Sequence, residues 1–157
     1  MNQRAALLHA PLAAQSVEGV GRLPGHAEAL ARLMAERERM PFQWAVHDCC
    51  LWASDAVLAQ VGVDPAATLR GRYSNAMQAS RVLAVLGGLE GVARSALGEP
   101  LQSPMLACAG DVGLTHGEED GQALGVCIGA WWAVASRDGL SLRPLSAASV
   151  AWRVGCA

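Results

Sequence analysis

A cysteine directly after an aspartate is the feature of this sequence best suited to chemistry. Asp48 and Cys49 open the run CCLWASDAV, which favours a helix, so Cys49 would lie in the first helical turn. There, free backbone N–H groups and the positive end of the helix dipole favour a thiolate over a thiol. A thiolate is the nucleophile of acyl-transfer enzymes, which also need an imidazole base and a group that orients it. Cysteine is also among the most often buried residue types, so packing alone is the alternative explanation for Cys49.

The segments that must position Cys49 predict helices first and strands afterwards. We expect four helices, at 26–39, 49–61, 75–86 and 89–97. Asp48 and Ser74 are suited to cap two of them, and Gly62 is suited to end the second. After Pro100, short runs rich in Val, Trp, Leu and Ile predict strands at 111–115, 123–129, 131–135, 140–143 and 150–154. This order indicates an α+β domain, with the helices on one side of a small antiparallel sheet.

The beginning of the chain has a different character. Residues 1–25 contain several Pro and Gly residues and no sustained periodicity, which predicts an irregular N-terminal arm before a single domain at 26–157. His9 and Pro11 interrupt the first apolar stretch, which is therefore a poor match to a signal peptide. We expect synthesis in a reducing cytoplasm and free thiols.

Composition excludes several classes of function. The 157 residues include 12 basic side chains, all arginine, and 14 acidic ones, for a net charge of −2. A hydrophobic content of 52% and a charged content of 17% fit one folded domain and argue against a nucleic-acid-binding basic face. No apolar stretch approaches the about 20 residues of a membrane span. The five cysteines include no C-x-x-C pair, so we expect neither a zinc site nor any other cofactor.

Several motifs resemble known families. The run PFQWAVHDCCLWASDAV resembles the catalytic helix of NlpC-type cell-wall cysteine peptidases, and GDVGL and ALGVCIG are similar to two core strands of that family. From about Leu30 to Val154, the chain more closely resembles a family of small proteins encoded in the tail modules of phages and prophages. The motifs that carry this second resemblance are PFQW, HDCCLWASDAV, GVDPAATLRGRY, GGLEG, GDVGL, LGVCIG, DGL and AWRV. The resemblance implies a papain-like, NlpC-type fold.

The resemblance also implies roles for individual positions. Cys49 matches the nucleophile, and Asp111 matches a strand-opening turn residue that has no catalytic role. Ala123 occupies the position of the general-base histidine and has no titratable group. Ala45 stands where a glycine usually follows the tryptophan. The third catalytic position falls about one strand after the base, where Ser136 is the one polar residue.

Another histidine would have to replace the missing base. His116, in the loop sequence THGEEDG, could fold back toward Cys49, although a solvated loop histidine is the alternative. We expect the following residues Glu118, Glu119 and Asp120 to form a solvated acidic loop. His47 directly precedes the helix cap, and we expect it to point away from the helix and to form local hydrogen bonds. Without a positioned base, amide hydrolysis should be slow or absent.

Two further features concern surfaces. Trp131 and Trp132 would point to opposite faces of a strand, so we expect one in the core and the other exposed or covered by a partner. Arg70 and Asp64 lie close in sequence and suggest either a salt bridge that stabilises the linker or a contact with a partner subunit.

The sequence therefore predicts a structural or assembly protein of a phage tail tip or baseplate, catalytically impaired because Ala123 replaces the base. It would be made in the cytoplasm of the host bacterium and become part of the virion. Its expected partners are hub, distal tail or tape-measure proteins, with peptidoglycan as a further candidate. The first alternative is an active peptidoglycan-cleaving cysteine peptidase or amidase, with Cys49 as nucleophile and His116 as base. The second is a protein that binds a small ligand in a groove beside Cys49.

Overall fold

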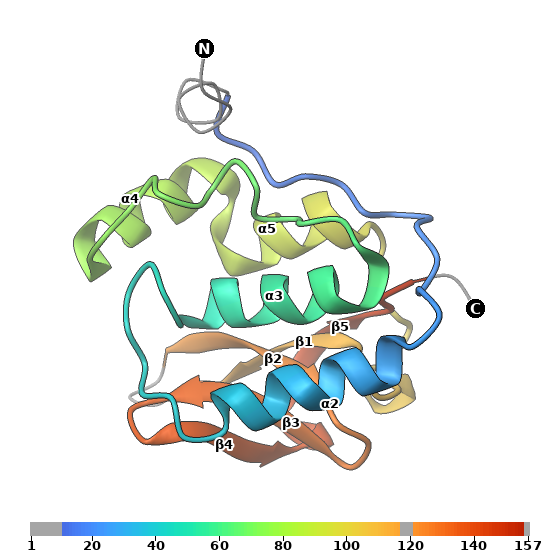
Figure 1. The fold of residues 1–157 in the computed structure, drawn as a ribbon. Coiled ribbons are helices and arrows are strands. Elements are labelled where there is room, and N and C mark those ends of the chain that lie inside the picture. Colours follow the sequence, from blue (N-terminus) through green and yellow to red (C-terminus); the bar gives the residue numbers. More distant parts are fainter. Residues whose placement is uncertain (1–10, 117–120, 156–157) are drawn as a thin grey trace.

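A computed structural model describes residues 11–116 and 121–155, which form helices followed by an antiparallel sheet (Figure 1). The helices are α2 (His26–Arg37), α3 (Cys49–Val61), α4 (Ala76–Leu86) and α5 (Gly88–Leu97). The strands are β1 (Val112–His116), β2 (Gln122–Cys127), β3 (Trp131–Ser136), β4 (Gly139–Pro144) and β5 (Ala148–Trp152). Short 3-10 turns, η1 (Pro104–Leu106) and η3 (Leu145–Ala147), precede β1 and β5. The predicted α+β order is confirmed.

The sheet has the strand order β4-β3-β2-β1-β5, and all neighbouring strands are antiparallel. Strands β1 to β4 form a meander, and β5 returns to pair with β1 at the opposite edge from β4. Helix α3 packs on one face of the sheet, mainly against β2, and α2 lies beside it. Helices α4 and α5 lie on the side of α3 away from the sheet (Figure 1). Helix α3 is therefore the central element of the fold.

The ends of α3 are fixed by the residues that the sequence indicated. The Asp48 side chain accepts hydrogen bonds from the backbone N–H of Leu51 at 2.9 Å and that of Ala45 at 3.1 Å, and from the hydroxyl of Tyr73 at 2.7 Å. Gly62 ends the helix in the left-handed conformation, with φ of 77°. Three donors on one buried carboxylate hold the first turn of α3, and with it Cys49, in place.

The start of α4 corrects one prediction. Asn75, not Ser74, is the N-cap, and its side chain accepts a hydrogen bond from the backbone N–H of Gln78. The backbone N–H and hydroxyl of Ser74 instead donate to the side-chain oxygen of Gln78. Both residues support the helix start, but the short Asn75 side chain reaches the helix N–H, so the helix begins one residue later than expected.

Residues 11–25 contain no regular helix or strand, as expected, but they lie on the surface of their own domain. Val17 is buried, and its N–H donates to the carbonyl of Ala96 in α5 at 2.8 Å. The N–H of Leu23 donates to the carbonyl of Gln60 in α3 at 2.7 Å. This part of the predicted arm therefore ties α5 to α3; the rest of the arm lies outside the described residues.

Three fully buried tryptophans organise the core. Each indole N–H donates to a backbone carbonyl, Trp52 to Ala133 at 2.9 Å, Trp132 to Leu145 at 3.1 Å and Trp152 to Gly98 at 3.1 Å. The ring of Trp132 lies over β1, where a Cβ atom placed on Gly113 would be 2.6 Å from it. The glycine of the GDVGL motif is therefore required by packing.

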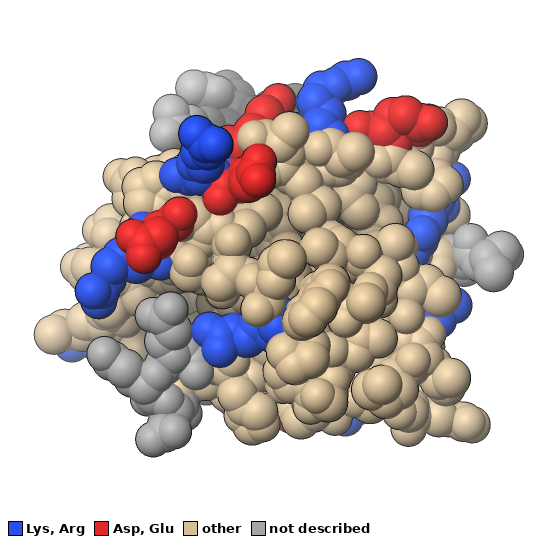
Figure 2. Space-filling view, turned by 90° about the horizontal axis from the view of Figure 1, so that it is seen from below, with Lys and Arg blue, Asp and Glu red and all other residues tan. Residues whose placement is uncertain are grey.

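One surface of the protein is mostly uncharged. Charged side chains gather along one edge of the face shown in Figure 2, and most of the rest of that face lacks them. On the strands, Trp131 is 46% exposed and Leu142 is 55% exposed, whereas Trp132 is fully buried. The expectation that one of the two adjacent tryptophans is core and the other exposed is confirmed. None of the helices in the described part of the chain is long and apolar enough to cross a membrane.

Candidate functional site

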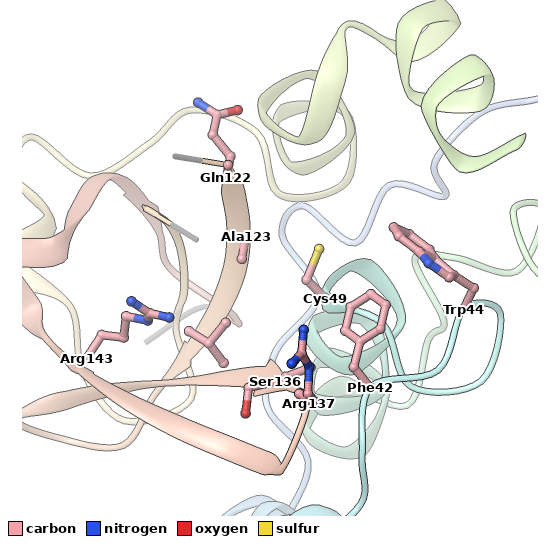
Figure 3. Close-up of a pocket in the computed structure, with 11 residues that line it drawn as sticks. Phe42, Trp44, Cys49, Gln122, Ala123, Ser136, Arg137 and Arg143 are labelled. Carbon is pink, nitrogen blue, oxygen red and sulfur yellow. The ribbon is translucent and has the colours of Figure 1, made fainter. Parts of the chain in front are cut away.

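A groove of about 550 Å³ lies beside the N-terminus of α3, between the segment before α3 and the strands β2, β3 and β4 (Figure 3). Its described lining comprises Phe42, Trp44, Cys49, Gly121, Gln122, Ala123, Val134, Ala135, Ser136, Arg137 and Arg143. The groove brings together Cys49 and Ala123, the two positions that the resemblance assigns to a nucleophile and its base. A volume of this size is in the range of small-ligand and peptide sites.

The surroundings of Cys49 favour its neutral thiol, whereas the helix terminus favours a thiolate. Burial raises the pKa of Cys49 to about 11, and the negative charge of Asp48 raises it further. The backbone N–H groups of Leu124, Cys50 and Cys49 itself favour the thiolate but do not outweigh the loss of hydration. Although part of the residue is exposed in the groove, its sulfur is largely desolvated. The helix terminus alone therefore does not activate this cysteine.

Ala123, on β2, lies beside Cys49, the first residue of α3. It is 8% exposed and belongs to the apolar cluster against which Cys49 packs. Figure 3 shows the two side chains approaching each other from different elements, Ala123 from β2 and Cys49 from the start of α3. A methyl group thus lies next to the thiol at the position that the resemblance assigns to the base. Ser136 also lines the groove, but its hydroxyl donates to the carbonyl of Gly139 in the β3–β4 turn.

Neither His116 nor His47 is among the described residues that line this groove. His116 is the exposed last residue of β1, opposite Gln122 in the sheet, and it is absent from the described groove lining. The described lining therefore holds no contact of His116 with the groove, and its role as a base for Cys49 stays a prediction. The acidic loop predicted at 118–120 lies outside the described residues.

His47 is fully buried behind the helix start. Its Nδ1 atom lies 3.1 Å from a guanidinium nitrogen of Arg37, and its ring contacts Trp52 edge-on. Burial and the charge of Arg37 lower the pKa of His47, so the imidazole is neutral and Nδ1 accepts the hydrogen bond. The predicted local hydrogen bond is confirmed, and it directs His47 toward α2.

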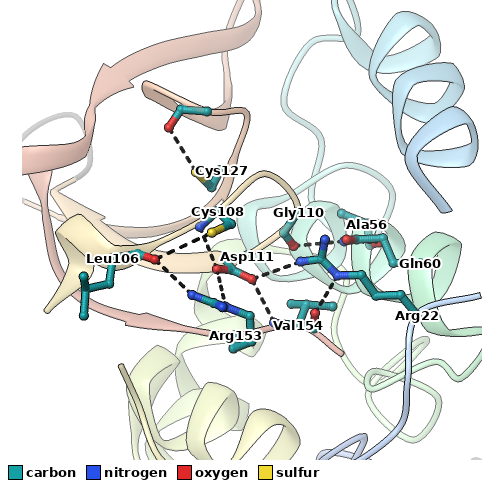
Figure 4. A network of polar contacts seen from close by, with 11 residues as sticks. Arg22, Ala56, Gln60, Leu106, Cys108, Gly110, Asp111, Cys127, Arg153 and Val154 are labelled. Atoms are coloured by element: carbon teal, nitrogen blue, oxygen red, sulfur yellow. Dashed lines mark hydrogen bonds and ion pairs between the residues drawn. The ribbon is translucent and has the colours of Figure 1, made fainter. Parts of the chain in front are cut away.

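Asp111 has a structural role, as the resemblance implied. It is fully buried just before β1 and accepts hydrogen bonds from the backbone N–H of Cys108 at 2.8 Å and of Val154 at 3.0 Å (Figure 4). Arg22 and Arg153 form ion pairs with it at 3.2 and 2.9 Å. This carboxylate joins the N-terminal segment, the start of β1 and the end of β5.

A second ionic network stabilises the linker after α3. Arg70 pairs with Asp64 at 2.8 Å and with Asp55 of α3 at 2.6 Å. Asp55 also pairs with Arg37 of α2 at 2.8 Å. Although burial opposes it, the hydrogen bond to Asp64 and the nearby carboxylates raise the pKa of Arg70. The salt-bridge explanation of the Arg70 region is therefore correct within this chain.

Two arginines of the groove, Arg137 and Arg143, were not predicted from the sequence. Arg137 follows β3 and Arg143 lies on β4, directly opposite Trp132. Because directly opposed residues of two antiparallel strands share a face of the sheet, Arg143 lies on the same face as Trp132. Alternation along β4 alone does not reveal this, since it requires the register between β3 and β4. The edge-to-face contact of Phe42 and Trp44, whose ring centroids are 4.9 Å apart, was also not predicted from the sequence.

Comparison with known families identifies one match. A family model described as a domain of unknown function, DUF6950, matches residues 21–154, and the chain belongs to this family. No curated protein matches the chain. Within residues 11–116 and 121–155, no group of three or more His, Cys, Asp or Glu side chains is arranged to hold a metal ion.

Proposed function

We propose that this protein is a structural or assembly component of a phage tail tip or baseplate, built on a papain-like, NlpC-type fold that has lost its catalytic base. The composition of the groove supports the proposed loss of catalysis. The thiol of Cys49, whose pKa is raised, faces Ala123, and no described lining residue is a histidine. A thiol whose pKa is about 11 needs a base at neutral pH, and the described lining of the groove contains no histidine that could serve as one.

Two features support a binding role for the same fold. The helix that carries Cys49 packs against the strand that carries Ala123, as an NlpC-type arrangement requires. The sparsely charged part of the face in Figure 2 and the exposed rings of Trp131 and Trp44 supply apolar surface for contacts with other proteins. The assignment to a phage tail rests on the motif resemblance over residues 30–154.

The first experiment tests catalysis. The protein is incubated with purified peptidoglycan, and released muropeptides are compared with those from a Cys49→Ala variant. We expect no difference between the two. Release by the wild type that Cys49→Ala abolishes would establish the alternative, an active peptidase or amidase, and loss of that release in His116→Gln would identify its base.

A second variant tests whether the missing base explains the inactivity. Ala123→His places an imidazole in the groove beside Cys49, where a protonated ring would stabilise the thiolate. Lowering the pKa by one unit corresponds to about 1.4 kcal/mol, so alkylation of Cys49 by iodoacetamide at pH 7.4 should accelerate several-fold or more. Gln122→His, at the neighbouring groove position, is the matched control. An unchanged rate in Ala123→His, with folding intact, would mean that Ala123 does not occupy the base position.

The third experiment tests the location. Phage particles are purified from a bacterial strain that carries the coding sequence in an inducible prophage, and their proteins are identified by mass spectrometry. We expect peptides of this chain in the particle and in isolated tails. Its presence in the lysate together with its absence from particles and tails would refute the tail assignment.

A further inference from the structure

The charge of the groove beside Cys49 is unbalanced. Arg137 and Arg143 both line it, and no acidic side chain does so among the described residues. Neither arginine forms an ion pair in the described part of the chain, in contrast to Arg22, Arg37 and Arg70. The groove therefore carries two positive charges that the protein does not neutralise with its described lining.

Arg143 is also incompletely satisfied. Its Nε atom is buried and has no hydrogen-bond partner within the described residues. Figure 3 shows its guanidinium pointing from β4 into the groove, and Arg137 enters from the end of β3. An anion bound in the groove would accept charge-assisted hydrogen bonds from the end of this guanidinium group, which points into the groove.

The walls of the groove supply apolar and aromatic surface. The rings of Phe42 and Trp44 lie at one side, and Val134 and Ala135 contribute aliphatic surface at the other. Trp44 is 37% exposed although it is one of the largest apolar side chains. A ligand that combines negative charge with apolar groups matches this lining better than a simple inorganic anion.

The spacing of the arginines favours an extended ligand. Arg143 lies four residues beyond Gly139 on β4, about 13 Å along a strand, whereas Arg137 lies in the turn before Gly139. The two backbones are therefore separated along the β3–β4 hairpin, and an extended chain with spaced carboxylates can contact both guanidinium groups. The volume of about 550 Å³ accommodates several residues of such a chain.

We propose that this groove binds an extended acidic peptide segment of a partner protein, with its carboxylates on Arg137 and Arg143 and its apolar side chains against Phe42 and Trp44. The proposal does not depend on where in the cell or virion the protein acts. It assigns a use to the groove that requires no reaction at Cys49.

Fluorescence anisotropy tests the proposal with the full chain. The probe is a fluorescein-labelled (Glu-Leu)₃ peptide, and matched (Gln-Leu)₃ and (Lys-Leu)₃ peptides control for charge. We expect binding of the acidic peptide only, weakened by added salt. Arg143→Gln and Arg137→Gln should each weaken binding about tenfold, as expected for loss of a charged hydrogen bond. Arg81→Gln, an exposed arginine of α4 outside the groove lining, should leave binding unchanged.

Several outcomes would overturn the proposal. Equal binding of the three peptides would exclude charge recognition, and equal losses in Arg81→Gln and Arg143→Gln would exclude this groove. Binding of glutarate as tight as that of the peptide would make a small dicarboxylate the ligand. Peptide binding that appears only after Glu118, Glu119 and Asp120 are replaced by Gln, Gln and Asn would show that the chain's own carboxylates pair with these arginines. Thermal melts of each arginine variant exclude unfolding as the cause of a loss.

Discussion

The raised pKa of Cys49 can be tested directly by the rate at which the thiol is alkylated. Burial moves the pKa from its ordinary 9.0 to about 11. At pH 8, the thiolate fraction falls from about 9% to about 0.1%, a hundredfold decrease. A thiolate of higher pKa is intrinsically more nucleophilic, which for two units recovers about a factor of six to ten. Cys49 should therefore react about tenfold more slowly than an ordinary thiol.

The assay is alkylation by iodoacetamide from pH 6 to pH 11, with modified peptides quantified by mass spectrometry. Cys108 is exposed and serves as an internal reference within the same chain. The rate at Cys49 should rise about tenfold for each pH unit up to pH 10 and approach its half-maximum near 11. Far-ultraviolet circular dichroism at each pH identifies the range in which the protein stays folded.

A rate at Cys49 that reaches a plateau below about pH 8.5 would refute this reasoning. Such a plateau would mean that the backbone N–H groups at the start of α3 outweigh desolvation, as the sequence alone predicted. An activated thiolate in a groove would then favour the enzymatic alternative. A rate that matches Cys108 at every pH would show instead that the sulfur is fully hydrated.

Three other predictions concern stability. Gly113→Ala places a Cβ atom 2.6 Å from the ring of Trp132, and it should lower the free energy of unfolding in urea by about 1–3 kcal/mol; no loss would mean that the ring can move. Ala45 has φ of 68°, so Ala45→Gly should stabilise the protein by about 0.5–1 kcal/mol, net of the glycine entropy cost. The pKa of buried His47 is lowered from 6.5, so the unfolded chain binds a proton that the folded chain resists, and stability should fall as the pH drops below 6.5. His47→Gln should flatten that dependence in thermal melts, and an unchanged slope would exclude His47 as its source.

The helix ends and the buried or exposed positions along a strand were predicted well from the sequence, because each depends on a few neighbouring residues. Asp48 caps α3 and Gly62 ends it because a carboxylate and a left-handed glycine act within one turn. The adjacent Trp131 and Trp132 divide between surface and core because side chains alternate along any strand. The error at Ser74 also was local, because two suitable cap residues stood side by side.

The chemistry of the groove was less predictable because it depends on contacts between distant segments. The position of Cys49 in its helix was predicted correctly, but the desolvation that raises the pKa of its thiol was not, because that desolvation comes from distant parts of the chain. His116 lies opposite Gln122 because of the register between β1 and β2, and no local sequence pattern predicts that register. The groove arginines lacked a motif, and only the β3–β4 pairing brings Arg143 to this face.

The contacts of Asp48 distinguish a structural role of the Asp48–Cys49 pair from a catalytic one. Asp48 binds three donors, among them the hydroxyl of Tyr73, so the fold requires it whether or not a reaction occurs next door. Its charge also raises the pKa of Cys49, which opposes activation of the neighbour it positions. In an enzyme, an imidazole cation at the position of Ala123 would offset that charge; here a methyl group leaves it unopposed. The pair that first suggested catalysis thus stabilises the start of α3, and the charge of Asp48 favours the protonated form of the Cys49 thiol.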